Sequence, residues 1–364
     1  MMKALCYLGS KTIKWQTVAK PTLKSPTDVI GKLSALTLCG SDLHIIAGHV
    51  KESTDIAESQ PGRGLILGHE GIIKVEEVGD AVKNFKRGDV CIVSCITSCG
   101  ECYYCKRDLQ SHCNRTEGTS GWILGHEIDG TQAEYVRIPY ADQSLYKAPE
   151  NVPIESLLML SDILPTAYEV GVVSGNVKKG DTVAIVGLGP VGLSALLSAK
   201  ALDPAKIIAI DMDDSRLEVA RRLGAHETIN PGKQDAAKLV HELTASEGKS
   251  SGVDVAIECV GVPATFEMCE DLLCPGGHLS NVGVHGSSVE LKLQELWIKN
   301  ISISTGLVSA YSTETLLQKV IDKKLDPTPL ATHHFKLSEI EKAYDVFSHA
   351  ADNQAIKMVI TCDE

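Results

Sequence analysis

The stretch that decides the fold reads Asp181-Thr182-Val183-Ala184-Ile185-Val186-Gly187-Leu188-Gly189-Pro190-Val191-Gly192. A β-branched apolar run ends in the pattern G-x-G-x-x-G, and an apolar helical pattern continues to residue 202. In such a turn the first glycine permits the tight bend, the second lets the backbone approach a pyrophosphate, and the third lets helix and strand pack closely. Pro190 suits the first helical turn, where its missing N–H costs nothing. The turn therefore predicts a dinucleotide site at a helix N-terminus.

Strand and helix patterns alternate around this turn. The strand candidates are 181–186, 206–210, 253–257 and 277–282, and the helix candidates are 153–173, 191–202, 215–223 and 263–273. Alternation of this kind predicts an α/β fold with a doubly wound parallel sheet. We assign this domain to residues 156–298.

Asp211 ends the second of these strands, 19 residues after Gly192. A carboxylate at this place accepts hydrogen bonds from both ribose hydroxyls and repels a 2′-phosphate, so it favours NAD over NADP. Arg216 is close enough in sequence to accommodate that phosphate, which keeps NADP as the alternative. A purely structural turn is the competing interpretation, and the complete strand–turn–helix–strand unit disfavours it.

The residues on either side of this domain have a different pattern. Short β-rich runs broken by Gly, Pro and Asp stand at 28–33, 72–79 and 89–93. They predict a mostly antiparallel, barrel-like β domain over 1–155, with a polar surface loop at 51–64. The last part, 299–364, mixes both patterns. Its helix candidates are 313–323 and 338–347, and its final strand candidate is 357–360.

Length and charge limit the functions that the chain can have. It has 364 residues, with 35 Lys and Arg against 47 Asp and Glu, a net charge of −12 and a pI near 5.5. An acidic balance without a long basic run argues against broad nucleic-acid or anionic-membrane binding. No stretch approaches the roughly 18 apolar residues that span a bilayer, and the first residues lack the apolar core of a secretory signal. We expect a cytoplasmic protein of two domains.

Half of the twelve cysteines stand between residues 91 and 113. In a reducing compartment so dense a cluster indicates metal or redox chemistry rather than disulfides. Within the lobe 95–115, the spacing C-x2-C-x2-C-x7-C is formed by Cys99, Cys102, Cys105 and Cys113. Four thiolates make a closed tetrahedral site that suits structural zinc, with an iron–sulfur cluster as the alternative. Cys91 and Cys95 fall outside this spacing, and we interpret them as core or flanking residues.

A second set of metal-ligand types stands in the same β-rich region. It comprises Cys39-Gly40-Ser41-Asp42-Leu43-His44 and Gly68-His69-Glu70-Gly71. A Cys, a His and carboxylates are the ligands of catalytic zinc sites, which keep one coordination position for water or substrate. By themselves they are scattered polar residues, because a lone His is more often structural than a ligand.

Taken together, the motifs resemble those of the zinc-dependent medium-chain alcohol dehydrogenases over essentially the whole chain. The Cys39 motif, the Gly68-His69-Glu70 motif, the four-cysteine lobe, the nucleotide turn and Ile356-Lys357-Met358-Val359 follow one another in the family's order. This resemblance implies a GroES-like catalytic domain formed by 1–155 and 299–364, with a Rossmann domain inserted between them. It also implies two zinc ions per chain, one catalytic and one structural, and a homodimer or homotetramer.

By this resemblance Cys39 and His69 are the first two catalytic zinc ligands. The third is a Cys in the liver and yeast enzymes, whereas this chain has Asp162, as in the secondary-alcohol dehydrogenases and the formaldehyde-dehydrogenase-like branch. A carboxylate keeps the negative charge but donates less of it to zinc. Glu70 matches a carboxylate that lies close to the metal. Asp42 matches one that orients His69 through its other ring nitrogen.

The resemblance also implies the chemistry. Zinc lowers the pKa of the bound alcohol, Ser41 accepts the hydroxyl proton, and His44 relays it towards solvent. Hydride then passes to C4 of the nicotinamide. Family position places further residues at the cofactor, with Thr166 beside the nicotinamide, Val260, Val282 and Val284 under its carboxamide and ribose, and Lys357 at the pyrophosphate.

Two features near residue 122 concern the substrate. Gly121-Trp122-Ile123-Leu124 is similar to a segment that lines the substrate pocket in the secondary-alcohol enzymes. Trp122 would form an apolar wall there, and an ordinary core position is the equal alternative. The second triplet, Gly125-His126-Glu127, lies too near the cysteine lobe for the family register, and we interpret it as loop structure.

The resulting hypothesis is a zinc-dependent, NAD-preferring alcohol dehydrogenase or carbonyl reductase that acts on secondary or medium-sized alcohols and their carbonyl partners. Formaldehyde oxidation or dismutation and polyol oxidation are the alternatives within the same chemistry. A non-catalytic nucleotide-binding protein is the alternative from another class. It would not need Cys39, His69, Asp162 and the relay residues together, so their joint presence disfavours it.

Overall fold

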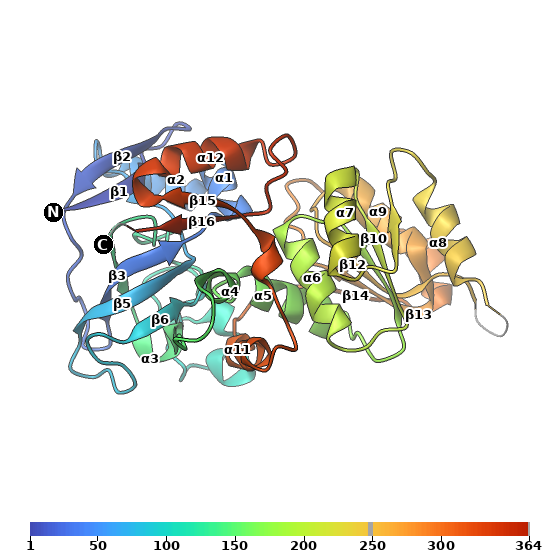
Figure 1. The fold of residues 1–364 in the computed structure, drawn as a ribbon, viewed down its shortest axis with the longest axis horizontal. Helices are drawn as coiled ribbons and strands as arrows, with labels where there is room; N and C mark the ends of the chain where they lie inside the picture. Colours follow the sequence, from blue (N-terminus) through green and yellow to red (C-terminus); the bar gives the residue numbers. More distant parts are fainter. Residues whose placement is uncertain (247–249, 363–364) are drawn as a thin grey trace. The chain divides into compact units, whose positions relative to one another are not determined.

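The structure, a computed structural model, describes residues 1–246 and 250–362 and divides the chain into two compact units. Unit 1 comprises Met1–Asp162, Ser309–Ile321 and Pro327–Glu364. Unit 2 comprises Ile163–Val308 and Asp322–Asp326. Both ends of the chain therefore belong to unit 1, and a long central segment forms unit 2 (Figure 1).

Unit 1 is built on two sheets. The larger has the order β15-β16-β3-β5-β6-β8, with β7 paired to β3, and its described pairs are antiparallel except β15–β16. The smaller has the order β2-β1-β4. These strands are β1 (Met2–Tyr7), β2 (Ile13–Val18), β3 (Val29–Leu36), β4 (Leu65–Ile66), β5 (Gly71–Val78), β6 (Val90–Val93), β7 (Tyr135–Ile138), β8 (Leu145–Lys147), β15 (Ala331–Lys336) and β16 (Lys357–Thr361). The predicted antiparallel β region is confirmed.

The helices of unit 1 are short. They are α1 (Gly40–Ile46), α2 (Lys51–Glu58), α3 (Ala141–Ser144), α4 (Ile154–Met159), α11 (Thr313–Ile321) and α12 (Ile340–Ser348), with 3₁₀ turns at Cys105–Arg107, Gln110–His112, Thr328–Leu330 and Leu337–Glu339. Apolar side chains of β3, β5, β6, β16 and α12 share one buried cluster. Burying that shared apolar surface stabilises the return of the C-terminal segment onto the N-terminal sheet.

The expectation of a surface loop at 51–64 is wrong for its first half, because Lys51–Glu58 forms α2. Ser53 and Ala57 are buried four residues apart on one face of this helix, whereas Asp55 is exposed. A short helix needs only a narrow buried stripe, so a polar sequence with two small residues at this spacing suffices.

Unit 2 contains one sheet of the order β11-β10-β9-β12-β13-β14, whose described pairs are all parallel. Its strands are β9 (Thr182–Val186), β10 (Lys206–Ile210), β11 (Glu227–Ile229), β12 (Val253–Glu258), β13 (Leu273–Asn281) and β14 (Ser302–Thr305). Its helices are α5 (Ile163–Thr166), α6 (Pro190–Lys200), α7 (Asp214–Leu223), α8 (Ala236–Thr244), α9 (Pro263–Leu272) and α10 (Leu293–Leu296), with a π-helical segment Ala167–Val173 and a 3₁₀ turn Trp297–Lys299.

The strands of unit 2 are buried along most of their length, as the continuous apolar runs in the sequence indicate. Each is followed by a helix or turn that returns the chain to the same end of the sheet, which is what parallel pairing requires. The predicted α/β fold, with a GroES-like region and a doubly wound parallel sheet, is confirmed.

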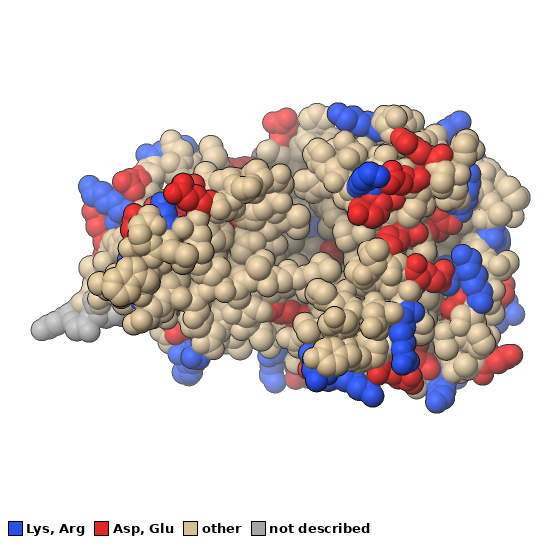
Figure 2. Space-filling model, turned by 180° about the vertical axis from the view of Figure 1, so that it is seen from behind, with Lys and Arg blue, Asp and Glu red and all other residues tan. Residues whose placement is uncertain are grey.

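The length of the helices and the distribution of surface charge are relevant to binding of a membrane or a charged partner. Within residues 1–246 and 250–362, no helix is long and apolar enough to cross a membrane. Basic and acidic side chains are interspersed over the face shown in Figure 2.

Candidate functional site

Cys39 caps the N-terminus of α1 in unit 1. It has an extended backbone, and its own N–H donates to Oδ2 of Asp42 at 3.0 Å. Asp42 lies in the first turn of α1, where a carboxylate also interacts favourably with the helix dipole. The local sequence Cys-Gly-Ser-Asp therefore fixes the position of the Cys39 thiol.

His69 lies in the short connection between β4 and β5. Gly68 precedes it with φ of +92°, and a Cβ at Gly68 would stand 2.5 Å from Cγ of Gln132. Only glycine satisfies both the left-handed backbone and this close approach. The side chain of His69 is 4% exposed, so the turn delivers the imidazole into the interior of unit 1.

Four potential metal ligands converge in unit 1. The ligand atoms of Cys39, His69, Glu70 and Asp162 all lie within 4.8 Å of one another. Oδ2 of Asp162 lies 3.5 Å from Sγ of Cys39 and 3.5 Å from Nε2 of His69. A thiol, an imidazole and carboxylates at this separation are a donor set that zinc prefers.

The electrostatics of this cluster also favour a cation. Burial, and next the charge of Asp162, raise the pKa of the Cys39 thiol. Burial raises the pKa of Asp42, and it raises that of Glu70 to about 7. Oε2 of Glu70 is buried and has no hydrogen-bond partner among the described residues. Cys39, Asp42, Glu70 and Asp162 thus share a buried site, and a bound dication would favour their ionised forms.

Lys357, which the family resemblance assigns to the pyrophosphate, lies beside the metal-ligand cluster. Its ammonium is buried and donates to Oε1 of Glu70 at 2.5 Å and to the carbonyl of Leu38 at 2.7 Å. The residue lies at the start of β16, whose register against β3 brings it to the metal-ligand cluster. Lys357 therefore forms a buried ion pair with Glu70, and its contact with a pyrophosphate stays a prediction.

Two residues that the sequence analysis does not indicate hold Asp42 in place through a chain of hydrogen bonds. Nε2 of Gln132 donates to Oδ2 of Asp42 at 3.0 Å, and the hydroxyl of Tyr344 donates to Oε1 of Gln132 at 3.0 Å. Oδ1 of Asp42 lies 3.8 Å from Nδ1 of His69. No local motif surrounds Gln132 or Tyr344, so the sequence offers no signal for them.

The two relay candidates lie on α1, one helical turn apart. Oγ of Ser41 is buried without a hydrogen-bond partner in the described part of the chain. His44 is exposed, and its Nδ1 lies 3.3 Å from Nδ1 of His49. Among the described contacts none joins Ser41 directly to His44. The helix that Cys39 caps thus carries one buried hydroxyl and one exposed imidazole, and the exposed His49 follows it.

The four cysteines of the lobe form a second cluster. Sγ of Cys102 lies 3.4 Å from that of Cys105 and 4.0 Å from that of Cys113, and Cys99 lies 3.9 Å from Cys105. The backbone N–H groups of Cys99 and Glu101 donate to the sulfurs of Cys113 and Cys99. Burial, and next the neighbouring Cys102, raise the pKa of Cys105 to about 12, so four thiolates need a cation to form together.

The nucleotide turn in unit 2 has the geometry that its glycines predict. Gly187 has φ of +90°, and a Cβ on Gly192 would stand 1.8 Å from the carbonyl oxygen of Gly187. At Gly189, by contrast, a Cβ would meet nothing within 4 Å, so the surface above it is open. Pro190 is the first residue of α6.

The other cofactor candidates of unit 2 surround this turn. Oδ2 of Asp211 accepts from the Leu188 N–H at 2.6 Å, and Arg216 lies 4.0 Å from the same oxygen. Val260 is 46% exposed and Val284 is 80% exposed, so both side chains are accessible to a ligand. Val282 and Thr166 belong to the same unit but lie in other segments, the end of β13 and the end of α5.

Trp122 lies next to the metal-ligand cluster. Its ring meets the ring of His69 edge-on, with centroids 5.9 Å apart. His126 lies in the turn 125–127 and is not part of the converging donor set. The interpretation of the second Gly-His-Glu triplet as loop structure agrees with this turn.

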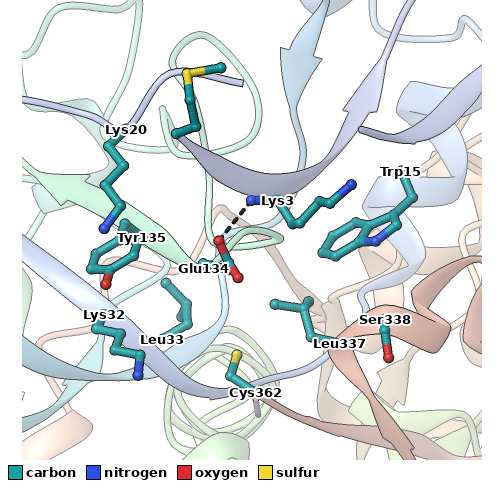
Figure 3. Close-up of a pocket in the computed structure, with 11 residues that line it drawn as sticks. Lys3, Trp15, Lys20, Lys32, Leu33, Glu134, Tyr135, Leu337, Ser338 and Cys362 are labelled. Atoms are coloured by element: carbon teal, nitrogen blue, oxygen red, sulfur yellow. Dashed lines mark hydrogen bonds between the residues drawn. The ribbon is translucent and has the colours of Figure 1, made fainter. Parts of the chain in front are cut away.

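A cavity of about 510 Å³ opens at another part of unit 1 (Figure 3). The Glu134 carboxylate in its wall accepts from the backbone N–H of Lys3 at 2.8 Å, and the Lys20 ammonium lies 3.7 Å from the centre of the Tyr135 ring. None of its lining residues belongs to either donor cluster. We therefore assign the chemistry to the clusters rather than to this cavity.

Two family models match the chain. The alcohol dehydrogenase GroES-like domain matches residues 25–150, and the zinc-binding dehydrogenase model matches residues 190–322. Fold and site together define an oxidoreductase with a nucleotide-binding unit and a unit rich in zinc ligands. More narrowly, the chain belongs to the zinc-dependent medium-chain alcohol dehydrogenase family. The resemblance seen in the motifs is confirmed.

Similar proteins cover the full length of the chain. It is 33% identical to an alcohol dehydrogenase of Cupriavidus necator, over 97% of this chain and 96% of that one. A solved zinc-dependent alcohol dehydrogenase 2 from Streptococcus pneumonia is 48% identical, with a TM-score of 0.90 over 100% of this chain and 99% of that one. The alcohol dehydrogenase TADH from Thermus sp. ATN1 is 31% identical, with a TM-score of 0.89 over the whole of both chains.

Proposed function

We propose that this protein is a zinc-dependent, NAD-preferring dehydrogenase that interconverts secondary or medium-sized alcohols and their carbonyl partners. The observation that carries the proposal is the convergence of Cys39, His69 and Asp162 in a buried site next to Trp122. Family membership supports the reaction class, and the names of the similar proteins agree with it.

Zinc fits the residues of this site. Cys39, His69 and Asp162 would hold it, and Glu70 offers a fourth donor, its buried Oε2 having no hydrogen-bond partner among the described residues. When bound, zinc supplies Lewis acidity, which makes an alcohol hydroxyl more acidic and a carbonyl more electrophilic. Asp42 positions His69 from the side of the other ring nitrogen, and this kind of support is worth as much as tenfold to a hundredfold in metal affinity or activity.

The chain itself provides the groups that move the proton. The buried Oγ of Ser41 can accept a proton from a substrate hydroxyl, and it has no competing partner among the described residues. His44, three residues along the same helix, is exposed, so its imidazole is open to solvent and suits a proton relay. His49 lies within contact of His44 and extends the same route.

The nucleotide turn supports NAD as the cofactor. The free N–H groups at the start of α6 and the open approach at Gly189 suit a pyrophosphate, and Asp211 disfavours a 2′-phosphate. When bound, NAD accepts or returns the hydride. We assign Thr166, Val260, Val282 and Val284 to the nicotinamide side, in agreement with the exposure of two of these valines.

The cysteine lobe would hold a second zinc ion. With four thiols as ligands it has no open coordination position, so its task is structural. The proposal therefore includes two zinc ions per chain. Family resemblance further supports a homodimer or homotetramer.

A titration with cofactor and substrates tests the proposal. The purified protein is assayed with NAD and with NADP against secondary alcohols, primary alcohols, formaldehyde and polyols, and zinc is measured on the same sample. We expect turnover of secondary alcohols with NAD and two zinc ions per chain. Two bound zinc ions without turnover of any alcohol or carbonyl would contradict the proposal, and equal turnover with NADP would contradict the assigned role of Asp211.

A further inference from the structure

Trp122 and His126 form an aromatic stack in unit 1. Their ring centroids are 4.2 Å apart and their planes are inclined by 25°, so the two rings are stacked in direct contact. The Trp122 ring also meets the His69 ring edge-on, at an interplanar angle of 85°. One indole thus links the metal-ligand cluster to the second Gly-His-Glu triplet.

A hydrogen bond joins the same two residues a second time. Nδ1 of His126 lies 2.7 Å from the carbonyl oxygen of Trp122. A carbonyl only accepts, so Nδ1 carries the proton and donates. Nε2 of His126 is buried and has no hydrogen-bond partner among the described residues. A buried acceptor without a partner is destabilising, so packing alone does not explain a histidine at this position.

The backbone of the turn that carries His126 is itself fixed. Gly125 has φ of +66°, and a Cβ there would stand 2.3 Å from the amide nitrogen of Gly68. On the other side, Oγ of Ser53 on α2 donates to the carbonyl of His126 at 2.8 Å, and both groups are buried. The turn is therefore anchored both to the residue before His69 and to α2.

Apolar neighbours also contact Trp122. It packs against a buried cluster that comprises Tyr7, Ile45, Ala57, Leu65 and Leu67. The indole is nevertheless only half-buried, so part of the ring that meets His69 edge-on remains exposed.

We propose that His126 is a positioning residue that sets substrate size selection. It clamps Trp122 at the ring and at the backbone carbonyl, and the fixed indole then excludes bulky substituents from the space beside His69. This inference rests on the proposed function. His126→Phe keeps a ring that can stack on Trp122 but removes the N–H donor. His126→Gln keeps a donor but removes the ring. The two variants therefore separate the contribution of the stack from that of the hydrogen bond.

The first experiment compares a bulky secondary alcohol with a small one. For each variant, kcat and KM are measured for 1-phenylethanol and propan-2-ol, and the ratio of their kcat/KM values is taken. Trp122→Ala is expected to raise this ratio about tenfold, because a pocket discriminates by that order for small changes in apolar volume. His126→Ala is expected to raise the ratio in the same direction, with kcat for propan-2-ol unchanged. His126→Phe and His126→Gln are expected to raise the ratio less than His126→Ala does.

A double variant decides whether His126 acts through Trp122. The ratio for Trp122→Ala combined with His126→Ala is expected to equal that of Trp122→Ala alone, because there is no longer an indole to hold. A further rise by the full factor of His126→Ala would overturn the proposal. So would an equal loss of kcat/KM for both alcohols in His126→Ala, which is the mark of a general structural role.

A second readout does not depend on activity. The chain has three tryptophans, so replacing Trp15 and Trp297 by Phe leaves Trp122 as the only indole. In that background His126→Ala is expected to raise acrylamide quenching of the fluorescence about twofold, because a loosened ring is more accessible to solvent. His349→Phe, at an exposed histidine after α12, is the matched control and should change nothing. Circular dichroism verifies that each variant is folded.

The two readouts separate the inference from the function on which it rests. Increased quenching in a protein that turns over no alcohol supports the clamp and rejects the proposed function. Unchanged quenching overturns the clamp whatever the activity.

Discussion

The two ligand clusters of unit 1 differ in how their residues come together. The cysteine lobe takes all four thiols from residues 99–113, a short segment that includes two 3₁₀ turns. The mixed cluster takes Cys39 and Asp162 from positions 123 residues apart, and His69 from a third segment. Short spacing gives a closed set of identical ligands, whereas distant segments bring together different ligand types.

The surroundings of the two clusters differ as well. The lobe is bordered by exposed residues such as Tyr103, and its sulfurs accept from nearby backbone N–H groups. The mixed cluster is surrounded by further buried groups, Asp42, Glu70 and Lys357, which are held by long-range contacts. The four-cysteine site is thus specified by a short segment of sequence, whereas the mixed cluster depends on charged groups that only the folded unit brings together.

The largest expected effect comes from removing the carboxylate ligand of the mixed cluster. Asp162→Asn takes away the charge that faces both Cys39 and His69. We expect kcat/KM to fall about 10³-fold, since even the loss of a group that supports a ligand costs 10–100-fold. Zinc content should fall from two to one per chain while circular dichroism stays unchanged. Asp162→Cys is the matched control and should retain two zinc ions; retention of full activity by Asp162→Asn would contradict the ligand assignment.

The next effect concerns the charge balance of the same cluster. Lys357→Met leaves the Glu70 carboxylate buried without its cation. We expect the free energy of unfolding to fall by about 3–5 kcal/mol, the usual cost of breaking a buried pair from one side. Denaturant unfolding measures it. Adding Glu70→Gln to Lys357→Met should recover part of the loss, and a double variant as unstable as the single one would show that the pair is not coupled.

Breaking the cysteine lobe should affect stability rather than chemistry. Cys113→Ser removes one of four thiols and with it the proposed structural zinc. We expect the free energy of unfolding to fall by about 3 kcal/mol, because loss of a bound metal is among the larger single-residue effects. The kcat of the remaining folded enzyme should stay within about twofold. Cys91→Ser, outside the lobe spacing, is the control. A loss of kcat without loss of stability would reverse the assignment of the two clusters.

The smallest effect tests how far the mixed cluster reaches towards solvent. His49→Asn removes the imidazole next to His44. We expect kcat to fall about twofold to threefold, because an exposed imidazole can be replaced by water as a proton acceptor. His44→Asn should cost more, and imidazole added to the assay should restore part of the rate of both variants. Equal activity of His44→Asn and the wild type would remove both residues from the relay.

Much of the fold is readable from the sequence because it depends on short-range patterns. The apolar run 182–186 and its glycine turn predict β9 and α6, and the runs 206–210 and 253–257 predict β10 and β12. The helix α2 was the clear error, because its two buried small residues carry no apolar signal. The cysteine spacing likewise indicates its cluster without any tertiary information.

What only the tertiary structure decided lies in contacts between distant segments. The sequence by itself determined the parallel sheet, the nucleotide turn, the four-thiol lobe and the family, because each can be recognised from patterns of residues close together in the chain. The pairing of Lys357 with Glu70 spans 287 residues, and that of Tyr344 with Gln132 spans 212. Local propensity carries no information about such partners, because strand register and packing bring them together only when unit 1 has folded. The stack of His126 on Trp122 joins residues only four apart, but it depends on the backbone of the turn and is likewise seen only in the folded unit.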